Sequence, residues 1–221
     1  ENYDVSKWNE ISVPGYWESN GYGRAKFTKF EYLFEPDPPL IDAELNAVGS
    51  YVKFFHLPKH WTGQRIVLHI GSVRSAIAIW INNEKVGYAE GSRNPVEFDI
   101  TEFVQPDSNR IAMQIFKYCD GSYLESGNGW QLGGIEGNIF LYCTHEIFIW
   151  DYQVETDLDD RYKGGVFQLN VKVKNVSDRD KGILKLDTKI LDGSNEIFKK
   201  SSVVDLSVNE KISVETMVDD V

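Results

Sequence analysis

Residues 117–135 hold the densest group of side chains that could do chemistry. The segment reads KYCDGSYLESGNGWQLGGI, with Asp120, Glu125 and Asn128 among several glycines and one isolated tryptophan, Trp130. A loop of this composition offers polar groups and an aromatic face, which is the lining that a sugar-binding rim needs. In the alternative interpretation the glycines form a plain connection and Trp130 fills the core. Taken alone, these residues favour that structural alternative.

Other catalytic and metal-binding patterns are missing from the sequence. His56 and His60 have the spacing of helical zinc ligands, but Pro58 between them disfavours a helix. The chain contains no P-loop, nucleophile elbow, HExxH or Rossmann glycine set. A glycosidase needs two carboxyl groups about 5–9.5 Å apart across a cleft. Sequence spacing identifies no such pair here, and we expect most of the carboxylates to be solvated.

The cysteines suggest no disulfide framework. The sequence has only two, Cys119 and Cys143, and we expect both to be free, half-buried thiols.

The elements that must position the loop are β-strands. Short runs rich in β-branched and aromatic residues cover residues 66–70, 76–81, 110–116 and 138–142. Residues 81–87 (INNEKVG) are typical of a hairpin turn. No sustained helical period is present, although residues 100–104 could form one turn with Thr101 as its N-cap. Many short strands separated by turns predict a jelly roll or sandwich.

The composition changes near residue 147. The first 147 residues hold 23 of the 29 aromatic residues, whereas the last 74 hold only 6. Beyond residue 165, apolar and polar residues alternate over 167–173 and 184–190, which predicts strands with one face in water. We therefore predict two domains, 1–147 and 148–221. The second has the pattern of an immunoglobulin-like sandwich but is shorter than the usual ~100 residues, so we expect it to be incomplete at its C-terminus.

Charge and hydropathy exclude several partners. The formal net charge is −11, which repels phosphate backbones and anionic lipid head groups, so neither nucleic acid nor a membrane surface is expected as a partner. No apolar run approaches the ~20 residues of a membrane span. The first residues are acidic and polar, with no initiating Met nearby, so we expect a processed protein or a piece of a longer one.

Several motifs together resemble the β-galactosidases of glycoside hydrolase family 2. The resemblance covers about 130 residues in the family's order and spacing. The matching blocks are VPGYWE with GYG (13–18, 21–23), LPKHW (57–61), SAIAIWIN (75–82), VGY (86–88), SRNPVEFDI (92–100), and DGSYLE followed by Trp130 and Gly134-Ile135 (120–135).

The resemblance implies an all-β fold and a role within a larger enzyme. In the family, a jelly-roll sugar-binding domain and an immunoglobulin-like sandwich precede a TIM-type barrel. That barrel carries the two catalytic glutamates of a retaining mechanism. We therefore expect the full-length parent to be a β-galactosidase, and this chain, with no catalytic residue of its own, to hydrolyse nothing.

Two positions here correspond to family residues that contact the sugar. The family's Asn in a Tyr-Thr-Asn-Val segment matches Lys29, and the third Asp of its DGSYLEDQD loop, which also binds sodium, matches Asn128. Asn128 keeps a carbonyl oxygen but loses the charge that favours a cation, while Lys29 introduces one. Both changes weaken the expectation of strict galactose selectivity.

The family's structural magnesium site maps onto Asp120 and Glu90, two hard oxygen donors. The alternative for Asp120 is a carboxylate that caps backbone N–H groups. The expected partners are a β-galactoside or related carbohydrate, the catalytic barrel, and a second copy in a homo-oligomer. Two alternative functions stay open: a stand-alone carbohydrate-binding module, and the same region of a β-glucuronidase or β-mannosidase.

Overall fold

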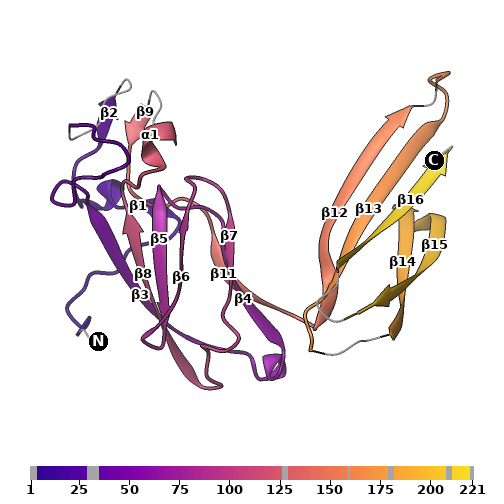
Figure 1. The fold of residues 1–221 in the computed structure, drawn as a ribbon, viewed down its shortest axis with the longest axis horizontal. Helices are drawn as coiled ribbons and strands as arrows, with labels where there is room; N and C mark the ends of the chain where they lie inside the picture. The colour runs from indigo at the N-terminus through magenta and orange to yellow at the C-terminus, as the bar shows by residue number, and fades with distance from the viewer. Residues whose placement is uncertain are drawn as a thin grey trace. The chain divides into compact units, whose positions relative to one another are not determined.

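The protein's structure is a computed structural model that describes residues 4–28, 35–125, 129–158, 160–178, 182–207 and 211–219. The side chains of residues 28 and 211–219 are outside the description. The chain divides into two compact units, Glu1–Cys143 and Thr144–Val221. The structure is almost entirely β, which confirms the predicted fold class (Figure 1). The unit boundary lies close to the predicted change in composition at residue 147.

The first unit contains two main antiparallel sheets. One has the strand order β3-β8-β5-β6 and the other β11-β4-β7. The bounds of these strands are β3 Val48–His56, β4 Arg65–Ile70, β5 Ala76–Ile81, β6 Glu84–Glu90, β7 Val96–Asp99, β8 Ser108–Phe116 and β11 Ile139–Thr144. They contain three of the four runs that the sequence predicts as strands, and β11 covers the fourth from Ile139 onward, so the four predicted strands are confirmed.

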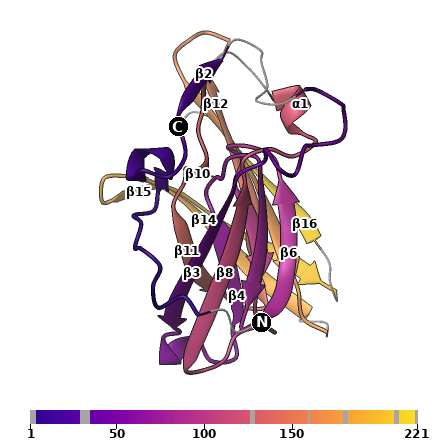
Figure 2. The same ribbon diagram turned by 90° about the vertical axis from the view of Figure 1, so that its left-hand side faces the viewer.

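Smaller elements gather at one end of this unit. Two short sheets pair β1 (Gly15–Tyr16) with β10 (Gly134–Ile135) and β2 (Lys26–Thr28) with β9 (Gly129–Gln131). The single α-helix of the described residues, α1, spans Ser122–Glu125, and a 3-10 turn covers Glu18–Asn20, whereas a second 3-10 turn, Lys59–Trp61, lies at the opposite end, beyond the last residue of β3. Figures 1 and 2 both place β2 and α1 beyond the ends of the long strands. The loop predicted to carry chemistry therefore lies at an end of the sandwich.

Strand alternation builds the core of the first unit. Every second residue of β4, β5 and β8 is buried and packs into one cluster: Ile66, Leu68, Ile70, Ile77, Ile79, Ile81, Ile111, Met113 and Ile115. Because these strands come from both sheets, the period of two buries one face of each sheet against the other. This is the packing of a sandwich.

The predicted hairpin is confirmed. A two-residue loop, Asn82-Asn83, joins β5 to β6, and both residues have positive φ values, 51° and 73°. Such values match the twist of a tight hairpin, and asparagine tolerates them better than most residues. Residues 100–104, where the sequence allows one helical turn, form a single hydrogen-bonded turn and no helix. Its Thr101 backbone N–H is capped by Asp99 at 3.1 Å, so Thr101 is the capped residue and not the cap.

The second unit is a smaller sandwich. Its strands are β12 Ile147–Leu158, β13 Gly165–Asn175, β14 Gly182–Asp192, β15 Asn195–Leu206 and β16 Lys211–Asp219. They form one sheet in the order β12-β13-β16 and a second that pairs β14 with β15. Side chains from both sheets meet in a buried cluster of Val171, Val173, Val204 and Leu206. The two alternating segments of the sequence lie in β13 and β14, as predicted.

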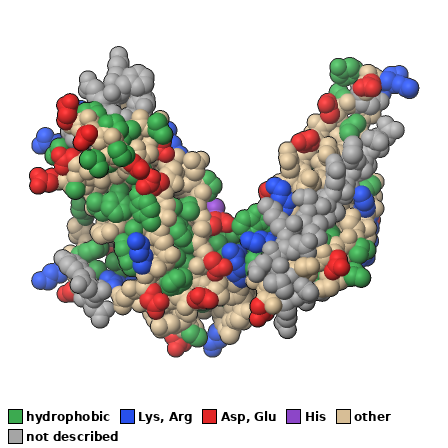
Figure 3. All heavy atoms as spheres, viewed as in Figure 1, with side chains coloured by type: hydrophobic (Ala, Val, Ile, Leu, Met, Phe, Trp, Pro, Cys, Tyr) green, Lys and Arg blue, Asp and Glu red, His purple; other side chains and the backbone are tan. Residues whose placement is uncertain are grey.

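The surface carries charges of both signs. Acidic and basic side chains are interspersed with apolar ones over the face shown in Figure 3. None of the helices in the described part of the chain has the length and apolar character that crossing a membrane requires.

Candidate functional site

Hydrogen bonds fix the loop that follows β8. The Oγ of Ser122 accepts a bond from the backbone N–H of Cys119 at 3.0 Å and lies 3.0 Å from the Oγ of Ser75. A carboxylate oxygen of Glu125 accepts a bond from the backbone N–H of Ser92 at 3.2 Å. The DGSYLE block is thus tied to the strand end at Ser75 and to the turn at Ser92, which holds the loop in place beside them.

Trp130 lies on the surface. It is 57% exposed, and its ring meets that of Phe27, which is 51% exposed, edge to face at a centroid distance of 5.5 Å. The alternative in which Trp130 fills the core is therefore wrong. The tryptophan that fills the core is Trp17, at 7% exposure. An exposed aromatic pair at a strand end is a platform on which the apolar face of a sugar can stack.

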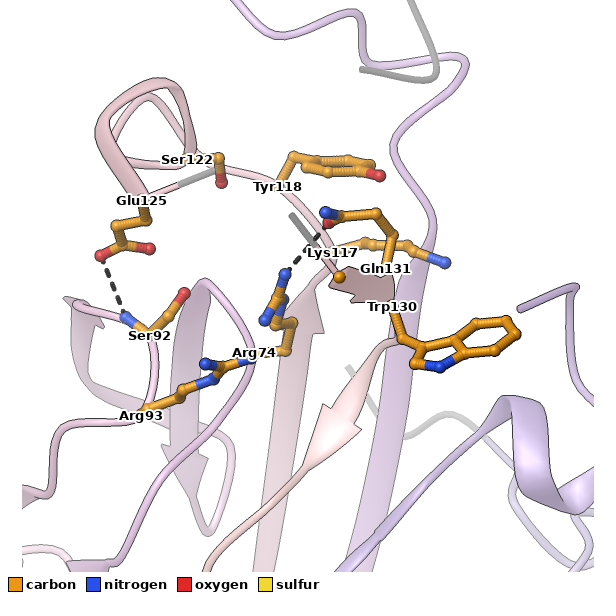
Figure 4. Close-up of a pocket in the computed structure, with 10 residues that line it drawn as sticks. Arg74, Ser92, Arg93, Lys117, Tyr118, Ser122, Glu125, Trp130 and Gln131 are labelled. Carbon is orange, nitrogen blue, oxygen red and sulfur yellow. Dashed lines mark hydrogen bonds between the residues drawn. The ribbon is translucent and has the colours of Figure 1, made fainter. Parts of the chain in front are cut away.

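Beside Trp130 lies a pocket of about 340 Å³ (Figure 4). Among the described residues that line it, the side chains charged at neutral pH are mostly basic: Arg74, Arg93 and Lys117, against one carboxylate, Glu125. The volume falls in the range of small-molecule sites, and it suits one monosaccharide unit. The pocket combines an aromatic face, polar groups and positive charge.

The charge of Lys117 is neutralised by the carboxylate of Glu18. Its Nζ lies 2.7 Å from a carboxylate oxygen of Glu18, and the two side chains are only 7% and 3% exposed. Both oxygens of Glu18 also accept the backbone N–H of Gly133, at 3.1 and 2.9 Å. This ion pair is therefore a structural brace under the pocket, because both charges are satisfied inside the fold.

The two arginines are held differently. The Nη2 of Arg74 donates to the side-chain oxygen of Gln131 at 3.0 Å, and Gln131 is buried. The Nε of Arg93 lies 3.7 Å from a carboxylate oxygen of Glu136, with Arg93 69% exposed. Arg93 thus has a carboxylate partner, whereas the fixed partner of Arg74 is a neutral amide.

A second cluster lies on the other side of the loop. Ligand atoms of Glu90, Cys119 and Asp120 are all within 4.8 Å of one another. Glu90 accepts a hydrogen bond from the hydroxyl of Tyr88; burial, together with this bond, raises the pKa of that hydroxyl. The backbone N–H of Gly121 donates to Asp120 at 2.9 Å. The two carboxylates fit a hard cation such as magnesium, whereas the thiol of Cys119 does not add to such a site.

A family model decides the class of the protein. Residues 2–145 match the model of the sugar-binding domain of glycosyl hydrolases family 2, which is more than half of the chain. The chain belongs to glycosyl hydrolase family 2. The match covers all but the first residue of the first unit and includes the loop, the pocket and the exposed tryptophan.

Relatives of this family-2 chain are much longer proteins. It is 32% identical over 217 residues to a β-galactosidase of Priestia megaterium, and the alignment covers 96% of this chain but 21% of that protein. A β-galactosidase of Psychromonas ingrahamii is 35% identical over 74% of this chain and 16% of its own length. The chain spans about a fifth of the length of these curated relatives.

Solved structures share the fold. A Bacteroides uniformis β-glucuronidase superposes with a TM-score of 0.79 at 20% identity, over 99% of this chain and 25% of that one. A protein described as a putative β-galactosidase of Bacteroides fragilis gives 0.67 at 17% identity, over 78% and 27%. At these identities the likeness bears on the fold.

The four site residues predicted for this family-2 chain divide into two pairs. Lys29 and Asn128 lie outside the described residues. Glu90 and Asp120 are close together, as the magnesium prediction requires; the binding of magnesium there stays a prediction. The free state expected for both cysteines is confirmed, with Cys119 buried and Cys143 half-buried.

Sequence reasoning missed the residues that give the pocket its charge. Arg74 and Gln131 are 57 residues apart in the chain and meet only because β10 returns to the end of β5. The sequence did contain a signal, because Arg74 immediately precedes the block SAIAIWIN and Arg93 lies within the block SRNPVEFDI. That both side chains enter the same pocket could be seen only once the strand pairing was known.

Proposed function

We propose that this chain is the non-catalytic N-terminal region of a β-galactosidase-like retaining hydrolase, where it shapes the sugar-binding pocket. The observation that carries the proposal is the pocket beside the exposed Trp130, formed by the DGSYLE loop within a domain of the sugar-binding family. The names of the relatives support a β-galactoside as substrate. The catalytic carboxylates are then supplied by a barrel elsewhere in the full-length protein.

The test compares the 221-residue chain with the protein encoded by its full reading frame. Both are assayed on nitrophenyl β-galactoside, β-glucuronide and β-mannoside. We expect the longer protein to hydrolyse the β-galactoside best and the chain alone to hydrolyse none. Faster hydrolysis of the glucuronide or mannoside by the longer protein would replace the galactosidase assignment. A stand-alone binding module predicts sugar binding but no hydrolysis by either protein.

For Lys29 and Asn128 we propose contact with the substrate. Replacing both with the residues of the family pattern, Lys29→Asn with Asn128→Asp, should raise kcat/KM of the full-length enzyme for galactosides. A charged hydrogen bond contributes roughly 1.5–3 kcal/mol, which corresponds to about tenfold to a hundredfold. An unchanged or lower kcat/KM would remove both residues from the substrate site.

For Glu90 and Asp120 we propose a magnesium site. Their carboxylates would hold the ion and so stabilise the loop between β8 and α1. Sodium at Asn128 is the weaker of the two metal proposals, because an amide offers no charge. Magnesium should raise the Tm of the chain, and Asp120→Asn should remove that effect while leaving the metal-free Tm little changed. An equal rise in the variant would place the ion elsewhere.

A further inference from the structure

The pocket beside Trp130 has a charge that differs from that of the whole chain. The protein has 34 acidic against 23 basic residues and a formal net charge of −11. In the pocket, three of the four described side chains that carry a charge at neutral pH are basic. Because Lys117 and Arg93 each face a carboxylate, of Glu18 and Glu136, the positive charge that the pocket offers to an anion is that of Arg74.

Arg74 is the cation in this pocket that has no ion-pair partner among the described residues. Lys117 is paired with Glu18 at 2.7 Å and Arg93 with Glu136 at 3.7 Å. Among the residues that the structure describes, no carboxylate lies within ion-pair distance of Arg74; its Nη2 is held by the neutral Gln131 at 3.0 Å. The half-buried guanidinium therefore keeps its other N–H groups for a ligand, in a fixed orientation.

The surroundings of Arg74 point to a saccharide as the carrier of the anion. Figure 4 shows the Arg74 and Arg93 side chains entering the pocket from the same side, with Trp130 at its edge. Trp130 offers an exposed ring that can stack on a sugar, and the pocket of about 340 Å³ has room for one sugar ring with its substituent. A planar guanidinium matches a carboxylate or sulfate through two parallel hydrogen bonds.

We propose that this pocket is a subsite for a negatively charged saccharide, in which Arg74 binds a carboxylate or sulfate substituent and Trp130 stacks on the ring. The proposal rests on the sugar-binding function given above and deepens it. Gln131 orients Arg74 through its side-chain oxygen and leaves the positive charge uncompensated. Arg93, which is more exposed and faces Glu136, lies beside Arg74.

The test is an NMR titration of the 221-residue chain that follows the indole N–H signal of Trp130. The probes share one ring: methyl β-galactoside, its 6-sulfate, and the corresponding 6-carboxylate. Inorganic sulfate is the fourth arm. At physiological salt we expect both charged sugars to bind about tenfold more tightly than the neutral one, from one charge-assisted pair. The carboxylate and sulfate arms show which substituent is preferred.

Three variants locate the effect. Arg74→Gln should abolish the preference for charged sugars. Gln131→Glu should do the same with almost no change of shape, because it places a carboxylate against the Arg74 guanidinium; it also serves if Arg74→Gln does not fold. The matched control is Arg110→Gln, which removes an equal charge at the opposite end of β8 and should keep the preference.

Several results would overturn the proposal. These are equal affinity for neutral and charged sugars, no binding of any sugar probe, a preference that survives Gln131→Glu, or inorganic sulfate binding as tightly as the sugar sulfate. The first leaves sugar binding intact and removes only the anionic subsite. Hydrolysis by the full-length protein is measured separately, so failure of this inference is distinct from failure of the proposed function.

Discussion

At the scale of residues, the buried pair of Glu18 and Lys117 explains why two of the family motifs belong together. Glu18 ends the VPGYWE block and Lys117 begins the segment that leads into DGSYLE, 99 positions later. Glu18→Gln should destabilise the first unit by roughly 3–5 kcal/mol, because it leaves the Lys117 charge buried without a counter-ion. Urea unfolding measures this loss.

The control for Glu18 is an exposed ion pair. Asp151→Asn removes the partner of Lys172, a pair whose side chains are 49% and 38% exposed. Exposed pairs contribute about 0–1 kcal/mol, so this variant should unfold nearly like the parent. Equal losses in the two variants would mean that burial does not decide the value of the Glu18 pair.

Replacement by alanine should change the stability of the protein at one of two nearby glycines and leave it unchanged at the other. At Gly133 an added Cβ would lie 1.8 Å from a ring carbon of Trp17, whereas at Gly129 it would meet nothing within 4 Å. Overpacking of this kind costs about 1–3 kcal/mol or more. Gly133→Ala should therefore lower the Tm clearly and Gly129→Ala should not. Similar Tm values for both would show that Trp17 can move aside.

At the scale of elements, the hairpin between β5 and β6 tests backbone conformation separately from packing. Asn83 has a φ of 73°, which a β-branched residue adopts at a cost of about 1–2 kcal/mol. Asn83→Val should lower the free energy of unfolding by about that amount, whereas Asn83→Gly should preserve or slightly raise it. A Val variant as stable as the Gly variant would contradict a turn with positive φ.

The strands could be predicted from the sequence, but the loops could not. Residues 76–81 form an apolar run that is buried at all but one position, and residues 110–116 are buried at alternate positions; both patterns are typical of strands. Trp130 was harder, because an isolated tryptophan among glycines fits either a core or a rim. The register of β2 against β9, which pairs Phe27 with Trp130, is what leaves it exposed. The same holds for Arg74 and Gln131, whose proximity depends on a long-range return of the chain.

At the scale of the whole molecule, the two units differ in how much they bury. Among the residues whose side chains are described, the core of the first unit contains 13 buried residues and that of the second contains 4. In the first unit β5 is paired on both sides, by β6 and β8, whereas β14 and β15 pair only with each other among the described strands. Local unfolding is easier where few apolar contacts and few shared strands resist it.

Amide hydrogen exchange should therefore be faster in residues 182–207 than in β5 and β8. The measurement is made by mass spectrometry at two protein concentrations, because an unpaired strand edge can also be covered by a second copy of the chain. In that case protection of the second unit rises with concentration while that of β5 does not. The contradicting result would be equal protection of both units at both protein concentrations. It would mean that the smaller core is as stable as the larger one, and that burial alone does not set the order of local unfolding.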